Sequence, residues 1–133
     1  MRYLLDSNIC IYAMKNRPPQ VLRRLQNVGR WAVAVSVFTV LELRQGAERS
    51  QHRELAHSRL DDFFKPMTVL PFEEADALVA ARIRAHLFQV GQPIGDFDSL
   101  IAGHALARDL TVVTNNSDEF ERIPDLRIEN WTV

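Results

Sequence analysis

Residues 3–14 read YLLDSNICIYAM, a short apolar run, three polar residues and a second apolar run. The first run, Tyr3–Leu5, predicts a buried β-strand. The polar residues Asp6–Asn8 are of the types that cap helix N-termini, so the second run, 9–14, predicts a helix. A strand that passes directly into a helix is typical of parallel α/β sheets, and here an acid stands at the junction.

The rest of the chain continues this alternation of apolar runs and helical stretches. Further strands are expected over 31–35, 67–70 and 110–114 and near 127–128. Helices are expected over 19–28, 36–49, 52–64, 71–91 and 96–108, with a short one around 119–120. Buried strands separated by helices predict an α/β fold, with three α/β/α layers around a central, mostly parallel sheet of four to five strands. The length of 133 residues fits a single domain, 1–133.

Composition narrows the class of protein. The formal net charge is −1, so no overall field attracts a polyanion such as RNA. Cys10 is the only cysteine, which excludes an internal disulfide and a thiolate metal cluster and suits a reducing compartment. No stretch approaches the ~20 apolar residues needed to span a bilayer, and the first apolar run is too short for a signal peptide. We therefore expect a cytoplasmic protein without a membrane partner.

Three acids stand where ligands bind in such a sheet, near the carboxyl ends of the strands. Asp6 ends the first strand, Glu42 interrupts an apolar helix, and one of Asp96 and Asp98, which flank Phe97, opens the helix over 96–108. Asp6 alone could be a helix cap, and Glu42 could be held by an ion pair with Arg44. If the three converge, carboxylates ~4 Å apart repel by about 4 kcal/mol at an effective dielectric near 20, so a cation must offset the cost. Oxygen ligands favour Mg²⁺ or Mn²⁺ over zinc.

Other polar residues near these positions have simpler interpretations. Asn115 and Asn116 follow the strand over 110–114, and turn chemistry accounts for both. Asp96 could be a plain cap for the helix that follows. His104 is expected on a face of the same helix, near the site, rather than as a metal ligand.

Four segments in order resemble the motifs of one known family. They are residues 4–9 (LLDSNI), 42–50 (ELRQGAERS), 93–105 (PIGDFDSLIAGHA) and 113–120 (VTNNSDEF). This set is similar to that of PIN-domain nucleases, specifically the VapC-type toxins of bacterial type II toxin–antitoxin pairs. Each motif alone is weak, but the four together, with residues 129–131, cover essentially the whole chain.

The resemblance implies a role for each matching position. The metal-binding and catalytic acids fall on Asp6, Glu42 and Asp98, and Asp96 falls on a variable position. The fourth metal position falls on Asn116, where many relatives carry Asp, so a tightly held second ion is in doubt. Supporting residues around the metal are expected at Ser7, Asn8, Thr114, Asn115 and Glu119.

The resemblance also implies an activity and partners. It implies a Mg²⁺-dependent, site-specific endoribonuclease, with Mn²⁺ able to substitute, that inhibits translation by hydrolysing tRNA, with the anticodon stem-loop of initiator tRNA as a candidate target. Five arginines are candidate phosphate contacts, namely Arg23, Arg24, Arg44, Arg49 and Arg53. A homodimer is implied, with a VapB-type antitoxin that fills a hydrophobic groove and joins a larger complex on operator DNA. The apolar stripes of 20–28 and 52–64 are candidates for that groove, and packing in the core explains both stripes equally well.

Competing interpretations are limited. A receiver domain needs a lysine after its last central strand, and neither Lys15 nor Lys65 is there. A phosphatase of the haloacid dehalogenase type needs a second Asp soon after the first, which Ser7–Cys10 does not supply. The remaining alternative is a catalytically weakened PIN-like protein that binds RNA or antitoxin without cutting, which Asn116 keeps open.

Overall fold

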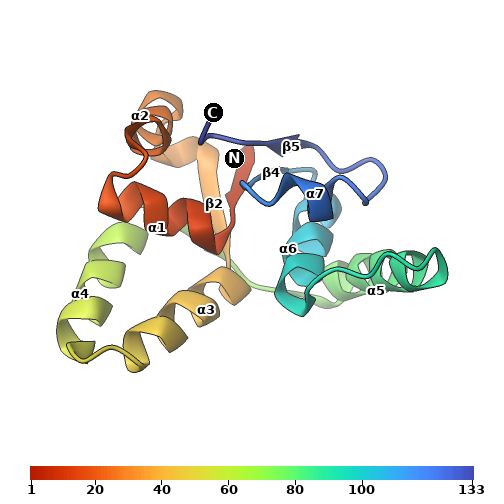
Figure 1. Ribbon diagram of the computed structural model, residues 1–133, viewed down its shortest axis with the longest axis horizontal. Helices are drawn as coiled ribbons and strands as arrows, with labels where there is room; N and C mark the ends of the chain where they lie inside the picture. Colours follow the sequence, from red (N-terminus) through yellow and green to blue (C-terminus); the bar gives the residue numbers. More distant parts are fainter.

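Five short strands, all parallel, form one sheet in the order β3-β2-β1-β4-β5 (Figure 1). The computed structural model describes residues 1–133. The strands are β1 (Tyr3–Leu5), β2 (Val33–Ser36), β3 (Thr68–Leu70), β4 (Thr111–Val113) and β5 (Ile128–Glu129). β1 is the central strand, and Leu5 lies in register with Val35 of β2 and Val113 of β4.

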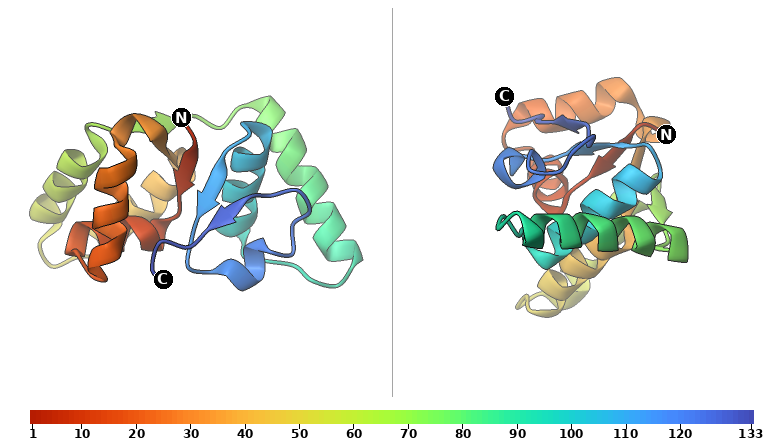
Figure 2. Two further views of the ribbon diagram at one scale, coloured as in Figure 1. Left: turned by 90° about the horizontal axis from the view of Figure 1, so that it is seen from above. Right: turned by 90° about the vertical axis from the view of Figure 1, so that its right-hand side faces the viewer.

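Helices cover both faces of this sheet, as the three-layer prediction required. They are α1 (Ser7–Lys15), α2 (Pro19–Val28), α3 (Val37–Glu48), α4 (Arg53–Phe64), α5 (Glu74–Gln89), α6 (Asp96–Ala107) and α7 (Ser117–Phe120). Figure 2 shows the sheet between α1–α4 on one side and α5–α6 on the other. The predicted fold class is therefore confirmed. No helix combines the length and the apolar character that a bilayer crossing requires.

Alternate residues of β1, β2 and β4, the three central strands, serve two separate cores. Leu5 and Val113 belong to a core of 16 buried residues that is shared with α1–α4. Their neighbours Leu4 and Val112 belong to a core of 12 buried residues that is shared with α5–α7. Because side chains alternate along a strand, a sheet covered on both faces needs apolar residues at every position. This explains why the strands are continuous apolar runs.

The closest helix pair is α5 and α6, and a glycine permits it. A Cβ on Gly103 would lie 2.6 Å from the Cβ of Ala80 and 2.7 Å from its Cα. Both distances are shorter than van der Waals contact, so a larger residue at position 103 would force the helices apart.

The strand predicted over 31–35 begins two residues before the observed strand β2. Trp31 was expected in the strand over 31–35, but it lies in a 3₁₀ turn, Arg30–Ala32, and is 96% exposed. Gly29 turns the chain at φ +83°, and the Ala32 amide donates to its carbonyl, so the backbone becomes extended only at Val33. The apolar side chain of Trp31 favours a buried strand and does not reveal this turn.

Candidate active site

The carboxyl ends of β1 and β4 form the point where the connections of the sheet diverge. α1 leaves β1 toward one face, and α7 leaves β4 toward the other (Figure 1). In open parallel sheets ligands bind in the crevice at this divergence. Asp6 follows β1 directly, and Thr114–Asn116 follows β4, so the structure brings two of the predicted site segments to this crevice.

Asp6 is a buried acid and also the cap of α1. Its Oδ1 accepts from the Ile9 amide at 2.9 Å, which confirms the capping interpretation. Burial raises the pKa of Asp6, while bonds from the Thr114 hydroxyl and from amides of α1 oppose the rise. Capping fixes this carboxylate at the base of the crevice, 5% exposed.

Glu42 lies on α3 and faces α1. The Ser7 hydroxyl donates to its Oε1 at 2.8 Å, and no basic side chain is within ion-pair distance. The alternative of an ion pair with Arg44 is wrong. Arg44 turns to α4, where it contacts Asp61 at 2.6 Å and the His57 carbonyl at 3.1 Å. Residues two apart on a helix point in different directions, so Glu42 remains an acid without a cationic partner.

Asp98, Asn116 and Glu119 form a hydrogen-bonded cluster across the crevice from α3. The Asn116 amide nitrogen donates to Asp98 Oδ2 at 3.1 Å and to Glu119 Oε2 at 3.0 Å. Burial, then the neighbouring Glu119, raises the pKa of Asp98 to about 7, with Asp6 and Glu42 adding to the rise. The bond from Asp98 lowers the pKa of Glu119. Asp98 therefore holds the proton of this pair near neutral pH.

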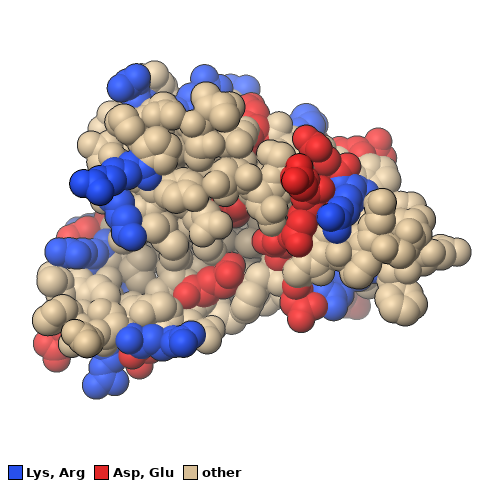
Figure 3. All heavy atoms as spheres, viewed as in Figure 1, with Lys and Arg blue, Asp and Glu red and all other residues tan.

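The three acids thus share one electrostatic environment. Asp6 and Glu42 each disfavour the ionised form of Asp98. As the side chains stand, no three His, Cys, Asp or Glu groups are arranged to enclose an ion. Each acid is directed instead to a donor of the protein, namely the Ile9 amide, the Ser7 hydroxyl or the Asn116 amide. Figure 3 shows acidic side chains at the centre of this face, in and beside its hollow, with basic ones around its edges.

The remaining predicted residues are divided between the site and its surroundings. Thr114 is buried between Asp6 and Asn116, and its hydroxyl accepts a hydrogen bond from the backbone amide of Asn116 at 2.9 Å. Asn115 is exposed and donates to the Tyr12 hydroxyl at 3.0 Å, away from the acids. Asn8 is exposed and reaches Asp6 only through its backbone. Asp96 is 84% exposed on its side chain and pairs with Arg84.

The candidate RNA-binding arginines differ in how free they are. Arg24 pairs with Glu129 at 3.3 Å and lies over the ring of Trp131, and Arg44 is held by α4. Arg23, Arg49 and Arg53 are exposed and make no ion pair. Only these three are free to contact a phosphate without first breaking an internal pair.

A groove of about 980 Å³ runs between α1, α3 and α4, and Glu42 is one of its lining residues. Its apolar lining includes Ile11, Met14, Leu43, Ala47, Leu60 and Phe63. No residue of α2 lines this groove, so the apolar stripe expected over 20–28 takes no part in it. Val21 and Leu25, the apolar stripe of α2, are fully buried in the core.

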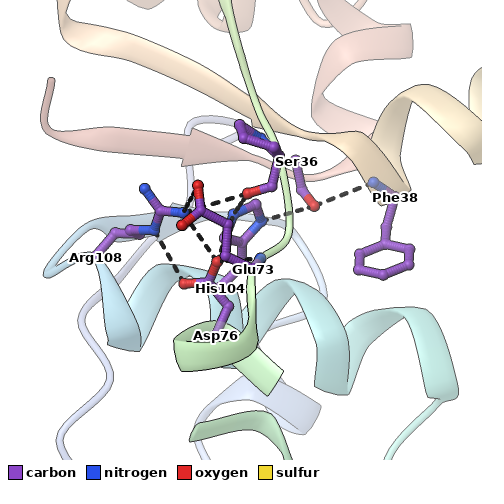
Figure 4. Close-up of polar contacts among 7 residues, drawn as sticks. Ser36, Phe38, Glu73, Asp76, His104 and Arg108 are labelled. Carbon is purple, nitrogen blue, oxygen red and sulfur yellow. Dashed lines mark hydrogen bonds and ion pairs between the residues drawn. The ribbon is translucent and has the colours of Figure 1, made fainter. Parts of the chain in front are cut away.

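His104 has an environment that the sequence did not indicate. It is completely buried in α6 rather than on an open face, with Nδ1 2.9 Å from Ser36 Oγ and Nε2 3.0 Å from the Pro71 carbonyl (Figure 4). The two partners lie 68 and 33 positions away in the sequence, so no local spacing could reveal them.

Comparison with known proteins agrees with this geometry. The PIN domain family model matches residues 3–126. The tRNA(fMet)-specific endonuclease VapC of Shigella flexneri is 42% identical over 132 residues, 99% of each chain, and Ribonuclease VapC2 of Haemophilus influenzae is 42% identical over 98% of each. The structure of DNA-bound VapBC from Salmonella typhimurium superposes with a TM-score of 0.93 at 40% identity, covering 98% of both chains. The chain therefore belongs to the PIN-domain family and, within it, to the VapC ribonucleases.

Proposed function

We propose that this protein is the toxin of a VapBC pair and a metal-dependent endoribonuclease that cleaves tRNA, with initiator tRNA as the first candidate. One observation carries the proposal. Asp6, Glu42 and Asp98 gather at the divergence point of a parallel sheet without a cationic partner, and burial, Glu119 and the charges of Asp6 and Glu42 together raise the pKa of Asp98 to about 7. Relatives from Shigella flexneri and Salmonella typhimurium, 42% and 40% identical, bear the name tRNA(fMet)-specific endonuclease.

The donor set fits a hard divalent cation. Asp6, Glu42 and Asp98 offer only carboxylate oxygens, which suit Mg²⁺ or Mn²⁺, and no buried basic group competes for them. We propose that Glu42 and Asp98 move to share an ion with Asp6, each carboxylate keeping one oxygen on its donor from the protein and offering the other. Asn116 presents its nitrogen to two carboxylates, so it contributes less as a ligand than as a clamp between Asp98 and Glu119. Asn116 carries no charge, but the carboxylate of Glu119 lies beside its side chain.

The side chains around the acids have separate tasks in hydrolysis. When bound, the cation supplies Lewis-acid activation of the phosphate and of the attacking water. Asp98 must lose its proton before it can act as a ligand, and its pKa of about 7 places that step near neutral pH. Ser7 orients Glu42, and the α1 cap holds Asp6 fixed. Arg23, Arg49 and Arg53 are available to contact the phosphates of the RNA.

The groove between α1, α3 and α4 supports regulation by an antitoxin. The Salmonella typhimurium and Rickettsia felis structures are VapBC complexes bound to DNA. We propose that a VapB-type antitoxin fills this apolar groove and places a basic residue against Glu42, which lines both groove and site. A homodimer, a complex on operator DNA and action in the cytoplasm, where tRNA is found, belong to the same proposal.

The test is cleavage of total tRNA by protein purified free of antitoxin, with Mg²⁺, with Mn²⁺ and with chelator. Wild type should give discrete products with either ion, and chelator should abolish them. Asp98→Asn should be inactive, whereas Asp96→Asn, on the same helix but exposed and paired with Arg84, should cleave like wild type. If the folded wild type gives no cleavage, the non-cutting alternative raised by Asn116 is favoured.

A further inference from the structure

A buried polar network connects the two helices that carry Glu42 and Asp98 (Figure 4). Ser36, the residue that caps α3, contacts His104 of α6 at 2.9 Å. Both side chains are 0% exposed. This is the only hydrogen bond between α6 and the segment formed by Ser36 and α3, although the helices also pack through Phe38 and Phe97, whose ring centroids are 6.3 Å apart.

The partners determine where the hydrogens lie. Nε2 of His104 faces the Pro71 carbonyl, which can only accept, so Nε2 carries the proton. Burial lowers the pKa of His104, so the ring is neutral and Nδ1 is an acceptor. The Ser36 hydroxyl therefore donates to Nδ1, while its oxygen accepts from the Phe38 amide at 3.1 Å. With these assignments every donor of the Ser36 and His104 side chains faces an acceptor, and every acceptor faces a donor.

The network continues from His104 to α5. Arg108, the residue that follows α6, donates to both carboxylate oxygens of Asp76, at 3.0 Å and 2.9 Å, and to the Pro71 carbonyl at 3.3 Å. Asp76 also accepts from the Glu73 amide in the capping box of α5. Polar contacts thus tie the end of α6 to α5 on one side and, through a single hydrogen bond, to the cap of α3 on the other.

The Ser36, His104 and Asp76 side chains are not a hydrolytic triad. All three are at most 1% exposed, so no substrate reaches them. The distance from His104 Nε2 to Asp76 Oδ2 is 3.7 Å, too long for the orienting hydrogen bond of a triad, and the serine is already occupied as a helix cap. The chemistry available to this network is structural.

We infer that His104 is a positioning residue, which sets the spacing of Glu42 and Asp98 through its bond to Ser36. Each end of that bond lies less than two helical turns from one acid, since Ser36 begins the helix of Glu42 and His104 lies on the helix of Asp98. Carboxylates that share an ion must keep their separation within a fraction of an ångström, and a rigid link between their helices achieves this. The inference rests on the proposed metal site.

Two substitutions of His104 separate its two bonds. Asn places an oxygen near the position of Nδ1 and can keep the Ser36 bond, whereas Gln places an amide nitrogen near Nε2 and can keep only the Pro71 bond. His104→Asn leaves the Pro71 carbonyl with its bond from Arg108 alone, whereas His104→Gln leaves the buried Ser36 hydroxyl without its acceptor, so Gln should lower the melting temperature at least as far as Asn. A purely structural role for His104 would lower stability without separating the two folded variants in their affinity for Mn²⁺.

The experiment is calorimetric titration of the folded proteins with Mn²⁺ alone. His104→Gln should weaken Mn²⁺ binding about tenfold or more, in the range seen when the supports of metal ligands are removed, and His104→Asn should bind within about twofold of wild type. Ser36→Ala should also lose about tenfold, and adding His104→Gln to it should cause little further loss, because the same bond is already broken.

Three outcomes decide the question. Wild-type affinity in both His104→Gln and Ser36→Ala would overturn the inference and leave the metal site standing. Equal weakening of His104→Gln and His104→Asn would also overturn it, by showing a general loss of packing. If wild type itself bound no Mn²⁺, or Asp98→Asn bound it as well as wild type does, the proposed function would fail and this inference with it.

Discussion

The close contact of α5 and α6 gives a quantitative prediction, because it rests on one missing methyl group. In Gly103→Ala the new Cβ would lie 2.6–2.9 Å from three atoms of Ala80, two of which belong to the backbone. Backbone cannot turn aside as a flexible side chain does, so the helices must separate. Overpacking of this kind costs about 1–3 kcal/mol, and the better helix propensity of Ala returns about 1 kcal/mol. With an overpacking cost near 3 kcal/mol, Gly103→Ala loses a net of about 2 kcal/mol of stability.

A matched substitution with the opposite expected sign is available in α3. Gly46 also lies within a helix, but a Cβ there meets no atom within 4 Å. Gly46→Ala should therefore stabilise the protein by about 0.5–1 kcal/mol through the reduced entropy of the unfolded chain. The two variants carry the same chemical change, so their stabilities should differ by about 3 kcal/mol.

Urea unfolding followed by circular dichroism measures both effects. The midpoint of Gly103→Ala should fall and that of Gly46→Ala should rise, with unchanged m-values. A Gly103→Ala protein as stable as Gly46→Ala would refute the argument, because it would mean that α5 and α6 separate without cost.

Three further predictions concern the polar groups. The hydrogen bond from Arg108 lowers the pKa of Asp76 in the folded protein. This carboxylate therefore stabilises the fold at pH values above its unfolded pKa of 3.8, and the stabilisation is lost as the pH falls through the lower folded value. The urea midpoint of Asp76→Asn should fall less steeply with acid than that of wild type. Ser7→Ala frees Glu42 and should slow single-turnover tRNA cleavage about tenfold, whereas an unchanged rate would show that Glu42 needs no support from Ser7. Asn116→Asp adds a carboxylate beside Asp98 and Glu119 and should tighten Mn²⁺ binding; calorimetry that shows no change would separate Asn116 from the metal site.

Much of the fold could be predicted because its determinants are local. Strands buried on both faces are continuous apolar runs, and residues such as Asp6 that cap a helix mark the junctions. The approach of Asp6 to Thr114–Asn116 follows from the rule that the carboxyl ends of parallel strands meet at one edge, whereas Asp98 lies on a helix that follows another helix and falls outside this rule. Trp31 shows the limit of this approach, because an apolar side chain next to a strand can still point to solvent when a glycine turns the chain before it.

The rest depended on contacts between distant segments. Arg44 was weighed as the partner of Glu42 because it is near in sequence, but it finds Asp61 on another helix. The apolar stripe of α2 does not show whether it faces the core or a groove, and only the packing shows that the groove lies between α1, α3 and α4. The bond between His104 and Ser36 spans 68 positions, a separation at which the sequence gives no signal.

The most direct test of the central claim is the affinity of Mn²⁺ for three proteins, measured by calorimetry at pH 7.5. Wild type and Asp96→Asn should bind alike, because Asp96 is exposed and paired with Arg84. Asp98→Asn should lose at least about tenfold in affinity, because a neutral amide replaces a charged ligand. Equal affinities in Asp98→Asn and Asp96→Asn would contradict the claim that the acids at the end of β1, on α3 and at the start of α6 hold a metal ion together.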